Sequence, residues 1–229
     1  MTSQRKPKIA IIDYGMGNLF SVNHACVYAG MKAVVTANTE EIISSDAVIL
    51  PGVGAFANAM DAVKRLDLVD TIREVAASGK YLVGICLGMQ LLMSVSYEFG
   101  KHQGLNLIPG EVVRFDNPRS NSGVLKVPHV CWNQLHRARA KGDPWAGTLL
   151  GGMKDGVCMY FVHSFYVKPE VSGVTVATTS YGHIEFCSAL QKNNIMAFQC
   201  HPEKSGPEGL KVYQNLSVLL AERIRETET

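Results

Sequence analysis

Long apolar runs, strong charge and paired cysteines are all missing from this sequence. No apolar stretch approaches ~20 residues, the length that a helix needs to cross a bilayer. The net charge is only +2, which gives no reason to expect a nucleic acid or a membrane surface as partner. The residues before the first apolar segment are polar and do not have the pattern of a secretory signal.

The cysteines are isolated from one another, at positions 26, 86, 131, 158, 187 and 200. None belongs to a CxxC pair, and no spacing matches a zinc site or a disulfide framework. We therefore expect reduced thiols, no bound metal and a cytoplasmic location. The 229 residues are 47% hydrophobic and 18% charged, enough for a substantial core. We expect one domain over residues 1–229, with its core at about 8–225.

The stretch around Cys86 is the strongest local signal. Residues 81–85 are short and apolar, which predicts a buried strand, and the apolar spacing over 87–95 predicts a helix. Cys86 lies between them, with Gly84 and Gly88 two residues away on either side. This pattern is typical of a nucleophile elbow with sulfur in place of a hydroxyl, and a following helix N-terminus favours thiolate. A buried structural cysteine is the alternative, because free cysteines are often buried.

The N-terminal half alternates apolar strands with helices. Strands are expected at 8–12, 31–37 and 47–50, with helices at 18–29, 39–45, around 56–63 and at 67–77. This alternation predicts a parallel sheet wrapped by helices. Glycine-containing turns follow three strands: Asp-Tyr-Gly-Met-Gly-Asn at 13–18, Pro-Gly-Val-Gly at 51–54 and the Cys86 turn. We expect all three at one edge of the sheet, where ligands collect.

The C-terminal half has a different texture, richer in β-branched strands and turns. Strands are expected at 111–115, 159–167 and 174–179, and a hairpin at 187–190 and 195–199. We interpret 116–123 as a surface loop, 137–155 as a loop with a short helix, and 207–225 as the final helix. These strands predict an antiparallel portion added to the parallel sheet.

His-Pro-Glu at 201–203 supplies what a nucleophilic cysteine needs. Histidine is the natural base near neutral pH, and a carboxylate two residues on can bind its other ring nitrogen. The motif alone is weak, since such a turn is often only structural. His129 and His163 are rival bases, because both lie in apolar strands. The other histidines, His24, His102, His136 and His183, are expected to be surface or packing residues.

Segments 84–90 (Gly-Ile-Cys-Leu-Gly-Met-Gln) and 201–203 together resemble the class I, triad-type glutamine amidotransferases. Within that superfamily, several segments are similar to the glutaminase subunits of imidazole glycerol phosphate synthase: 13–18, 51–54, 128–129, 132–133, 161–164 and 201–206. The resemblance covers about 9–220, with the motifs in the family's order. It implies an α/β, flavodoxin-like fold with a mostly parallel sheet flanked by helices and an antiparallel portion in the C-terminal half.

The resemblance implies a Cys-His-Glu triad. Cys86 is then the nucleophile, His201 the general base and acid, and Glu203 the residue that orients the histidine. The oxyanion hole uses the N–H of Leu87 and the Gly52–Val53 turn, a peptide thought in this family to need rearrangement. The residues expected to hold glutamine are Gly54, Gln90 and Tyr160, with the backbone of His163 and Ser164.

The implied activity is hydrolysis of L-glutamine to glutamate and ammonia, without a metal or organic cofactor. Asn18, Trp132 and Lys204 fall where the family contacts its partner, a (β/α)8-barrel cyclase that receives the ammonia in a heterodimer. That cyclase makes imidazole glycerol phosphate and AICAR in histidine biosynthesis.

Several departures from the family's pattern lie near the expected partner side. Cys131, Cys200 and Phe165 replace a usual glycine, aromatic residue and tyrosine, and the segments 116–123 and 137–155 look long. A relative that supplies ammonia to a sugar-modifying amidotransferase in surface-polysaccharide synthesis is therefore an alternative. A flavodoxin-like binding module would explain the sheet but not the triad. A free-standing cysteine hydrolase would need no exposed partner residues such as Met16 or Trp132.

Overall fold

The computed structural model describes residues 5–121 and 123–228. The helices are α1 (Leu19–Tyr28), α2 (Thr39–Ile43), α3 (Phe56–Arg65), α4 (Leu68–Ala77), α5 (Leu87–Leu91), the 3-10 turn η1 (Pro202–Lys204) and α6 (Gly206–Glu228). The strands of the first half are β1 (Lys8–Ile12), β2 (Lys32–Thr36), β3 (Ala47–Leu50), β4 (Tyr81–Ile85), β5 (Met93–Ser96) and β6 (His102–Gln103). Those of the second half are β7 (Ile108–Arg114), β8 (Arg119–Ser120), β9 (Gly123–Val124), β10 (His129–Arg137), β11 (Val157–His163), β12 (Phe165–Pro169), β13 (Thr175–Tyr181), β14 (Ile184–Lys192) and β15 (Ile195–Phe198).

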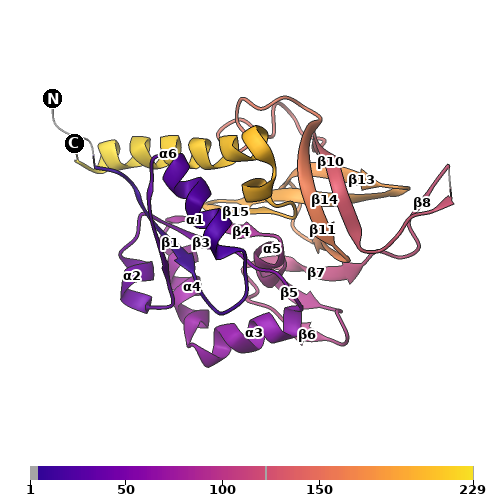
Figure 1. Ribbon diagram of the computed structural model, residues 1–229, viewed down its shortest axis with the longest axis horizontal. Coiled ribbons are helices and arrows are strands. Elements are labelled where there is room, and N and C mark those ends of the chain that lie inside the picture. Colours follow the sequence, from indigo (N-terminus) through magenta and orange to yellow (C-terminus); the bar gives the residue numbers. More distant parts are fainter. Residues whose placement is uncertain (1–4, 122, 229) are drawn as a thin grey trace.

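The central sheet is mixed, as the sequence predicts. Its strands follow the order β2-β1-β3-β4-β15-β14-β12-β7-β5-β6 (Figure 1). The first five of these pair in parallel, and β14, β12 and β7 continue the sheet in antiparallel pairs. The strands β10, β11 and β13 add a further antiparallel part beside β14. This is the parallel sheet with an antiparallel C-terminal portion that the sequence predicts, so the expected fold class is confirmed.

Two hydrophobic cores lie on opposite faces of the parallel strands. In β1, Ile9 and Ile11 pack toward α1 and α6, whereas Ala10 and Ile12 pack toward α2, α3 and α4. Figure 1 shows these helices on the two sides of the sheet. The side chains of β1 are buried on both faces because a parallel sheet is covered on both sides. Because β1, β3 and β4 pair in parallel, their carboxyl ends meet at one edge of the sheet, as expected.

The predicted helix over 87–95 is wrong in its second half. The helix α5 ends at Leu91, and the chain then enters β5, which pairs in parallel with β7. The residues at this break, Leu91 to Met93, are fully buried. An apolar run that is buried on every side carries no periodicity that separates helix from strand, so the pairing with β7 decides.

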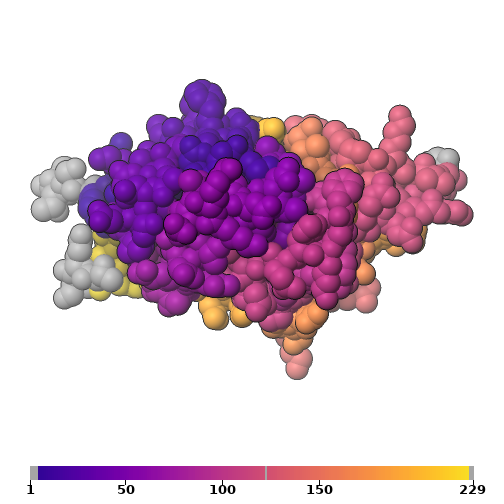
Figure 2. All heavy atoms as spheres, turned by 90° about the horizontal axis from the view of Figure 1, so that it is seen from below, coloured from indigo at the N-terminus to yellow at the C-terminus, as the bar shows by residue number. Residues whose placement is uncertain are grey.

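The expected single strand over 159–167 is two strands. The first, β11, ends at His163 and pairs with β10, while β12 begins at Phe165 and pairs with β7 and β14. The expected loop at 116–123 carries the short pair β8 and β9. This pair projects from one end of the molecule (Figures 1 and 2).

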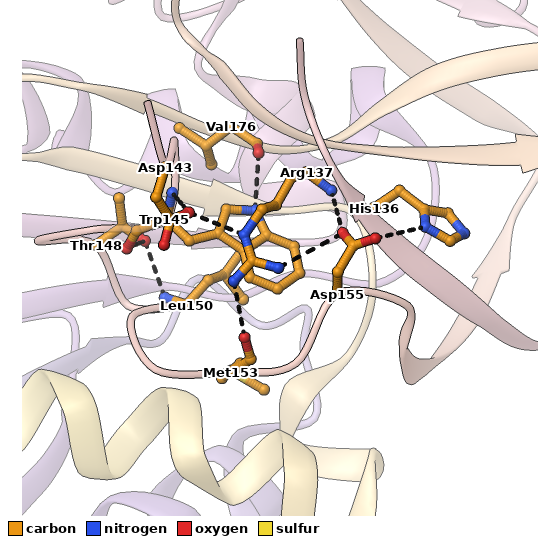
Figure 3. A network of polar contacts seen from close by, with 9 residues as sticks. All are labelled: His136, Arg137, Asp143, Trp145, Thr148, Leu150, Met153, Asp155 and Val176. Carbon is orange, nitrogen blue, oxygen red and sulfur yellow. Dashed lines mark hydrogen bonds and ion pairs between the residues drawn. The ribbon is translucent and has the colours of Figure 1, made fainter. Parts of the chain in front are cut away.

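Residues 138–156 form turns and contain no helix, which corrects the helix expected within 137–155. Glycines with positive φ at 142, 147, 152 and 156 prevent helix propagation. Arg137 anchors this segment. Its Nε donates to Oδ1 of Asp143 at 2.9 Å, and its guanidinium carbon lies 4.4 Å from the ring centre of Trp145 (Figure 3). The fully buried Trp145 donates its indole N–H to the Val176 carbonyl at 2.8 Å.

Candidate active site

Cys86 occupies a strained turn between β4 and α5. Its φ of 54° and ψ of −109° lie in a region that non-glycine residues rarely adopt. A Cβ on Gly88 would lie 1.8 Å from the Leu50 carbonyl oxygen, and a Cβ on Gly84 would lie 3.0 Å from the backbone nitrogen of Met89. The two flanking glycines are therefore required by close backbone approach, as the elbow pattern predicts.

His201 and Glu203 form a buried pair in the turn that follows β15. The Nδ1 atom of His201 lies 2.8 Å from Oε1 of Glu203, and both side chains are almost fully buried. Burial disfavours the charged form of His201, but Cys86 and Glu203 outweigh burial and raise the pKa of His201 to about 10. The Nε2 atom makes no hydrogen bond among the described residues. That nitrogen is therefore available to exchange a proton with the Cys86 sulfur or a leaving group.

Ser205 supports His201 through hydrogen bonds to the backbone, and although it lies in the 201–206 segment, sequence reasoning assigned it no role. Its hydroxyl donates to the His201 carbonyl at 2.6 Å and accepts the backbone N–H of Tyr160 at 2.9 Å. The N–H of His201 in turn donates to the Tyr160 carbonyl at 2.9 Å. These bonds fix the His201 turn to β11, so the imidazole is oriented by the sheet as well as by Glu203.

The turn at 51–54 closes over the start of α5. The backbone N–H of Leu87 donates to the Gly52 carbonyl at 3.4 Å, a long bond. The hydroxyl of Tyr14 donates to the Pro51 carbonyl at 2.7 Å. A Cβ on Gly52 would lie 2.2 Å from that hydroxyl, so only glycine fits there. Sequence reasoning missed Tyr14, although it belongs to the 13–18 segment.

The residues expected to bind glutamine surround this centre to different degrees. Gln90 is buried and donates to the Phe165 carbonyl at 3.1 Å. The ring of Tyr160 lies with its centre 6.5 Å from that of His201. Gly54 has a φ of +110°, and the Ser164 carbonyl accepts the N–H of Phe115 at 3.0 Å. Their role in substrate binding stays a prediction.

The rival bases His129 and His163 pair with each other, 3.0 Å apart, and neither has a carboxylate partner in the part of the chain that the structure describes. Burial lowers the pKa of His129 to about 4 and that of His163 to about 3. Both rings are therefore neutral at physiological pH. A ring with so low a pKa is a weak base and holds no proton to donate at neutral pH, whereas His201 has the carboxylate partner that a general acid and base needs.

The residues expected to contact a partner are reachable from outside. Trp132 is 56% exposed, Lys204 is exposed and Asn18 is half-buried. The ring centres of Trp132 and Tyr160 lie 6.2 Å apart, and Tyr160 in turn neighbours His201, so a single side chain connects the exposed indole to the His201 turn. Among residues 5–121 and 123–228, no cluster of metal-binding side chains occurs. No helix in that part of the chain is long and apolar enough to span a bilayer.

Comparison with known proteins decides the family. The family model described as glutamine amidotransferase class-I matches residues 10–219. The chain belongs to the class I glutamine amidotransferases. Solved structures show the same fold at low sequence identity: PurLQS from Thermotoga maritima has a TM-score of 0.68 at 18% identity, with 93% of this chain and 98% of that chain covered. The glutaminase domain of Trypanosoma brucei CTPS has a TM-score of 0.65 at 15% identity, with 95% and 94% covered.

Curated relatives within this class are much more similar. The Geobacter metallireducens protein named "Imidazole glycerol phosphate synthase subunit HisH" is 47% identical over 92% of this chain and 97% of its own length. Proteins of the same name from Moorella thermoacetica and Aquifex aeolicus are 47% and 44% identical, covering 93% and 91% of this chain and 95% of each relative. The similarity thus extends over nearly the whole of both chains.

Proposed function

We propose that this chain is the glutaminase subunit of imidazole glycerol phosphate synthase, the enzyme of histidine biosynthesis that takes its nitrogen from glutamine. The buried His201–Glu203 pair beside the strained Cys86 turn carries the chemical part of this proposal. The assignment to histidine biosynthesis rests on the 47% identity, over nearly the full length, to proteins named as HisH subunits. The whole chain acts as one glutaminase domain, and we place it in the cytoplasm.

Hydrolysis proceeds through a thioester. The Cys86 thiolate adds to the carboxamide carbon of glutamine, and the carbonyl oxygen takes the negative charge. His201 donates its proton to the nitrogen, the C–N bond breaks and ammonia leaves. His201 then removes a proton from water, which adds to the thioester and releases glutamate and the thiolate. Glu203 keeps Nδ1 protonated, so that Nε2 faces the reacting atoms. No metal takes part in these steps.

The tetrahedral intermediate needs two N–H groups near its oxygen. One is the N–H of Leu87, which in the resting turn is engaged by the Gly52 carbonyl. Rotation of the Gly52–Val53 peptide would release that N–H and aim the N–H of Val53 at the same point. Each donor of this kind is worth about 100- to 1,000-fold in rate. The turn therefore sets how active the chain is when the triad is already assembled.

Ammonia must reach its acceptor before water protonates it, which favours a complex over a free hydrolase. We propose a heterodimer with a (β/α)8-barrel cyclase subunit, docked on the side that carries Asn18, Trp132 and Lys204. The exposure of Trp132 supports this placement, because tryptophan is enriched at interface hot spots. In that complex the ammonia is consumed in forming imidazole glycerol phosphate and AICAR.

The decisive experiment couples glutamate release to cysteine labelling. A diazo-ketone analogue of glutamine should label Cys86, and Cys86→Ala should abolish both labelling and glutamate release while the protein stays folded. Labelling mapped instead to Cys131 or Cys200 would contradict the assignment of the nucleophile.

The partner is tested in the same assay. Addition of the cyclase and its ribonucleotide ligand should stimulate glutamate release from the wild-type chain. Stimulation by a sugar-modifying amidotransferase, and none by the cyclase, would place the chain in the polysaccharide branch instead. Full activity without either partner would indicate a free-standing hydrolase.

A further inference from the structure

The Cys86 sulfur has a hydrogen-bond donor that the triad does not include. The carboxamide nitrogen of Gln199 lies 3.7 Å from Sγ of Cys86, a contact lengthened by the large radius of sulfur. Gln199 is fully buried and follows β15 directly. The Cys86 N–H donates to the Phe198 carbonyl at 2.7 Å, which fixes the two segments side by side.

The direction of this contact follows from a second glutamine. The Nε2 atom of Gln90 lies 3.1 Å from the Phe165 carbonyl, which can only accept, so a nitrogen must occupy that position. The same Nε2 lies 3.2 Å from Oε1 of Gln199 and gives it the second N–H. With its oxygen engaged in this way, Gln199 is left with its NH2 group facing the sulfur. Inversion of either amide would place like groups against each other.

The Phe165 carbonyl that anchors this arrangement is held from the other side by the neutral histidines. The Nδ1 atom of His163 donates to it at 2.8 Å, which leaves Nε2 of His163 as an acceptor. The Nδ1 atom of His129, 3.0 Å away, must then be the donor, and Asn133 lies 3.2 Å from the remaining ring nitrogen. One set of donors and acceptors therefore satisfies the whole buried chain of bonds.

We propose that Gln199 is a further residue of the catalytic site, whose carboxamide donates a hydrogen bond to the Cys86 thiolate and holds the sulfur in place, with its orientation fixed by Gln90. This inference rests on the proposed function. Cys86 is only 6% exposed, so a thiolate that forms there during the reaction needs hydrogen-bond donors from the protein. The same donor also assists the second half of the reaction, in which the sulfur leaves the thioester as a thiolate.

The proton equilibrium between Cys86 and His201 gives a direct measure of this bond. A hydrogen bond to the thiolate favours the thiolate–imidazolium pair over the neutral pair, and loss of a bond to a charged group typically costs about tenfold or more. Gln199→Met keeps the chain length but removes the donor. We expect it to lower the thiolate absorbance at neutral pH and to decrease kcat more than it changes KM.

Alkylation of Cys86 by iodoacetamide is the second readout, because this small electrophile does not need the glutamine site. We expect Gln199→Met to slow alkylation by about threefold or more, since higher intrinsic nucleophilicity offsets part of a tenfold loss of thiolate. Gln199→Glu, which turns an acceptor toward the sulfur, should slow it further. The matched control is Gln191→Met in β14, whose carboxamide donates to the Asn193 carbonyl and not to sulfur.

Side-chain amide NMR of the wild-type protein keeps the proposal testable if a variant does not fold. Alkylation of Cys86 removes the charge from sulfur, so the NH2 resonances of Gln199 should shift and those of Gln191 should not. Unchanged Gln199 resonances, or wild-type alkylation rates in folded Gln199→Met, would overturn the proposal. Absence of any reactive thiolate at Cys86 in the wild type would instead overturn the triad itself, so the two failures are distinguishable.

Discussion

The resting oxyanion turn makes a quantitative prediction about the isolated chain. In the proposed mechanism the Leu87 N–H is one of two oxyanion donors, and because it is paired with the Gly52 carbonyl, at least one donor is missing until the peptide rotates. One donor corresponds to about 100- to 1,000-fold in kcat, or about 2.7–4 kcal/mol. We therefore expect the chain alone to be slower than its complex by about that factor.

The free energy needed to rotate the Gly52–Val53 peptide is small enough for a binding partner to supply. The bond to be broken is 3.4 Å long and joins neutral groups, so its net contribution is at most about 1 kcal/mol. Glycines at 52 and 54 allow the rotation, and the Tyr14 hydroxyl holds the preceding Pro51 carbonyl in place. A partner that binds the rotated turn better by a few kcal/mol is sufficient.

The assay is glutamate release at saturating glutamine, with and without the cyclase and its ligand. Trp132→Ala should reduce the partner-dependent gain much more than the basal rate. Val218→Ala is the matched control, because Val218 is as exposed as Trp132 (55% and 56%) but lies on α6. Full activity of the isolated chain, or an equal effect of the two substitutions, would refute the reasoning.

The remaining predictions concern the triad and the core. Glu203→Gln removes a charge that raises the pKa of His201, so the alkaline limb of the kcat/KM profile should move to lower pH; an unchanged limb would contradict the assigned roles. Gly88→Ala places a Cβ 1.8 Å from the Leu50 carbonyl oxygen, a closer contact than ordinary overpacking, which costs about 1–3 kcal/mol. We therefore expect denaturant unfolding to show a free energy of unfolding lowered by about 3 kcal/mol or more. Trp145→Ala, at a fully buried site, should lower the free energy of unfolding by about 3–5 kcal/mol, and a loss below 1 kcal/mol would show that the 138–156 segment is not anchored there.

The sequence predicts the parallel half of the fold well, because strand and helix periods alternate there and glycine turns mark the strand ends. It fails where burial removes the periodicity: Leu91 to Met93 are apolar and fully buried, and only the pairing of β5 with β7 shows where the helix ends. It fails again at 138–156, where the conformation depends on the contacts of Arg137 with Trp145 and Asp143. Those partners come together only in the folded chain.

The site shows the same division between residues marked by local sequence patterns and residues whose role depends on contacts in the folded chain. Cys86, His201 and Glu203 belong to short motifs that are weak singly and that together resemble those of a known family. Gln199 belongs to no such motif, and Ser205 lies in the 201–206 segment without an assigned role, because the importance of each depends on which atom it meets in the folded chain. The orientation of the Gly52 carbonyl is equally invisible in the sequence, since glycine permits either direction of the peptide.

The two halves of the proposed catalytic machinery are therefore in different states at rest. The His201–Glu203 pair and the Gln199 contact are already formed and buried, whereas the oxyanion turn is closed by its own carbonyl. A partner that acted on the triad would have to disturb bonds fixed by Ser205 and by the buried histidines. A partner that acted on the turn would need to rotate one peptide near the surface, where Val53 is 40% exposed. Because a ligand shifts an equilibrium only by its preference for one state, the turn is where binding can control the rate at least cost.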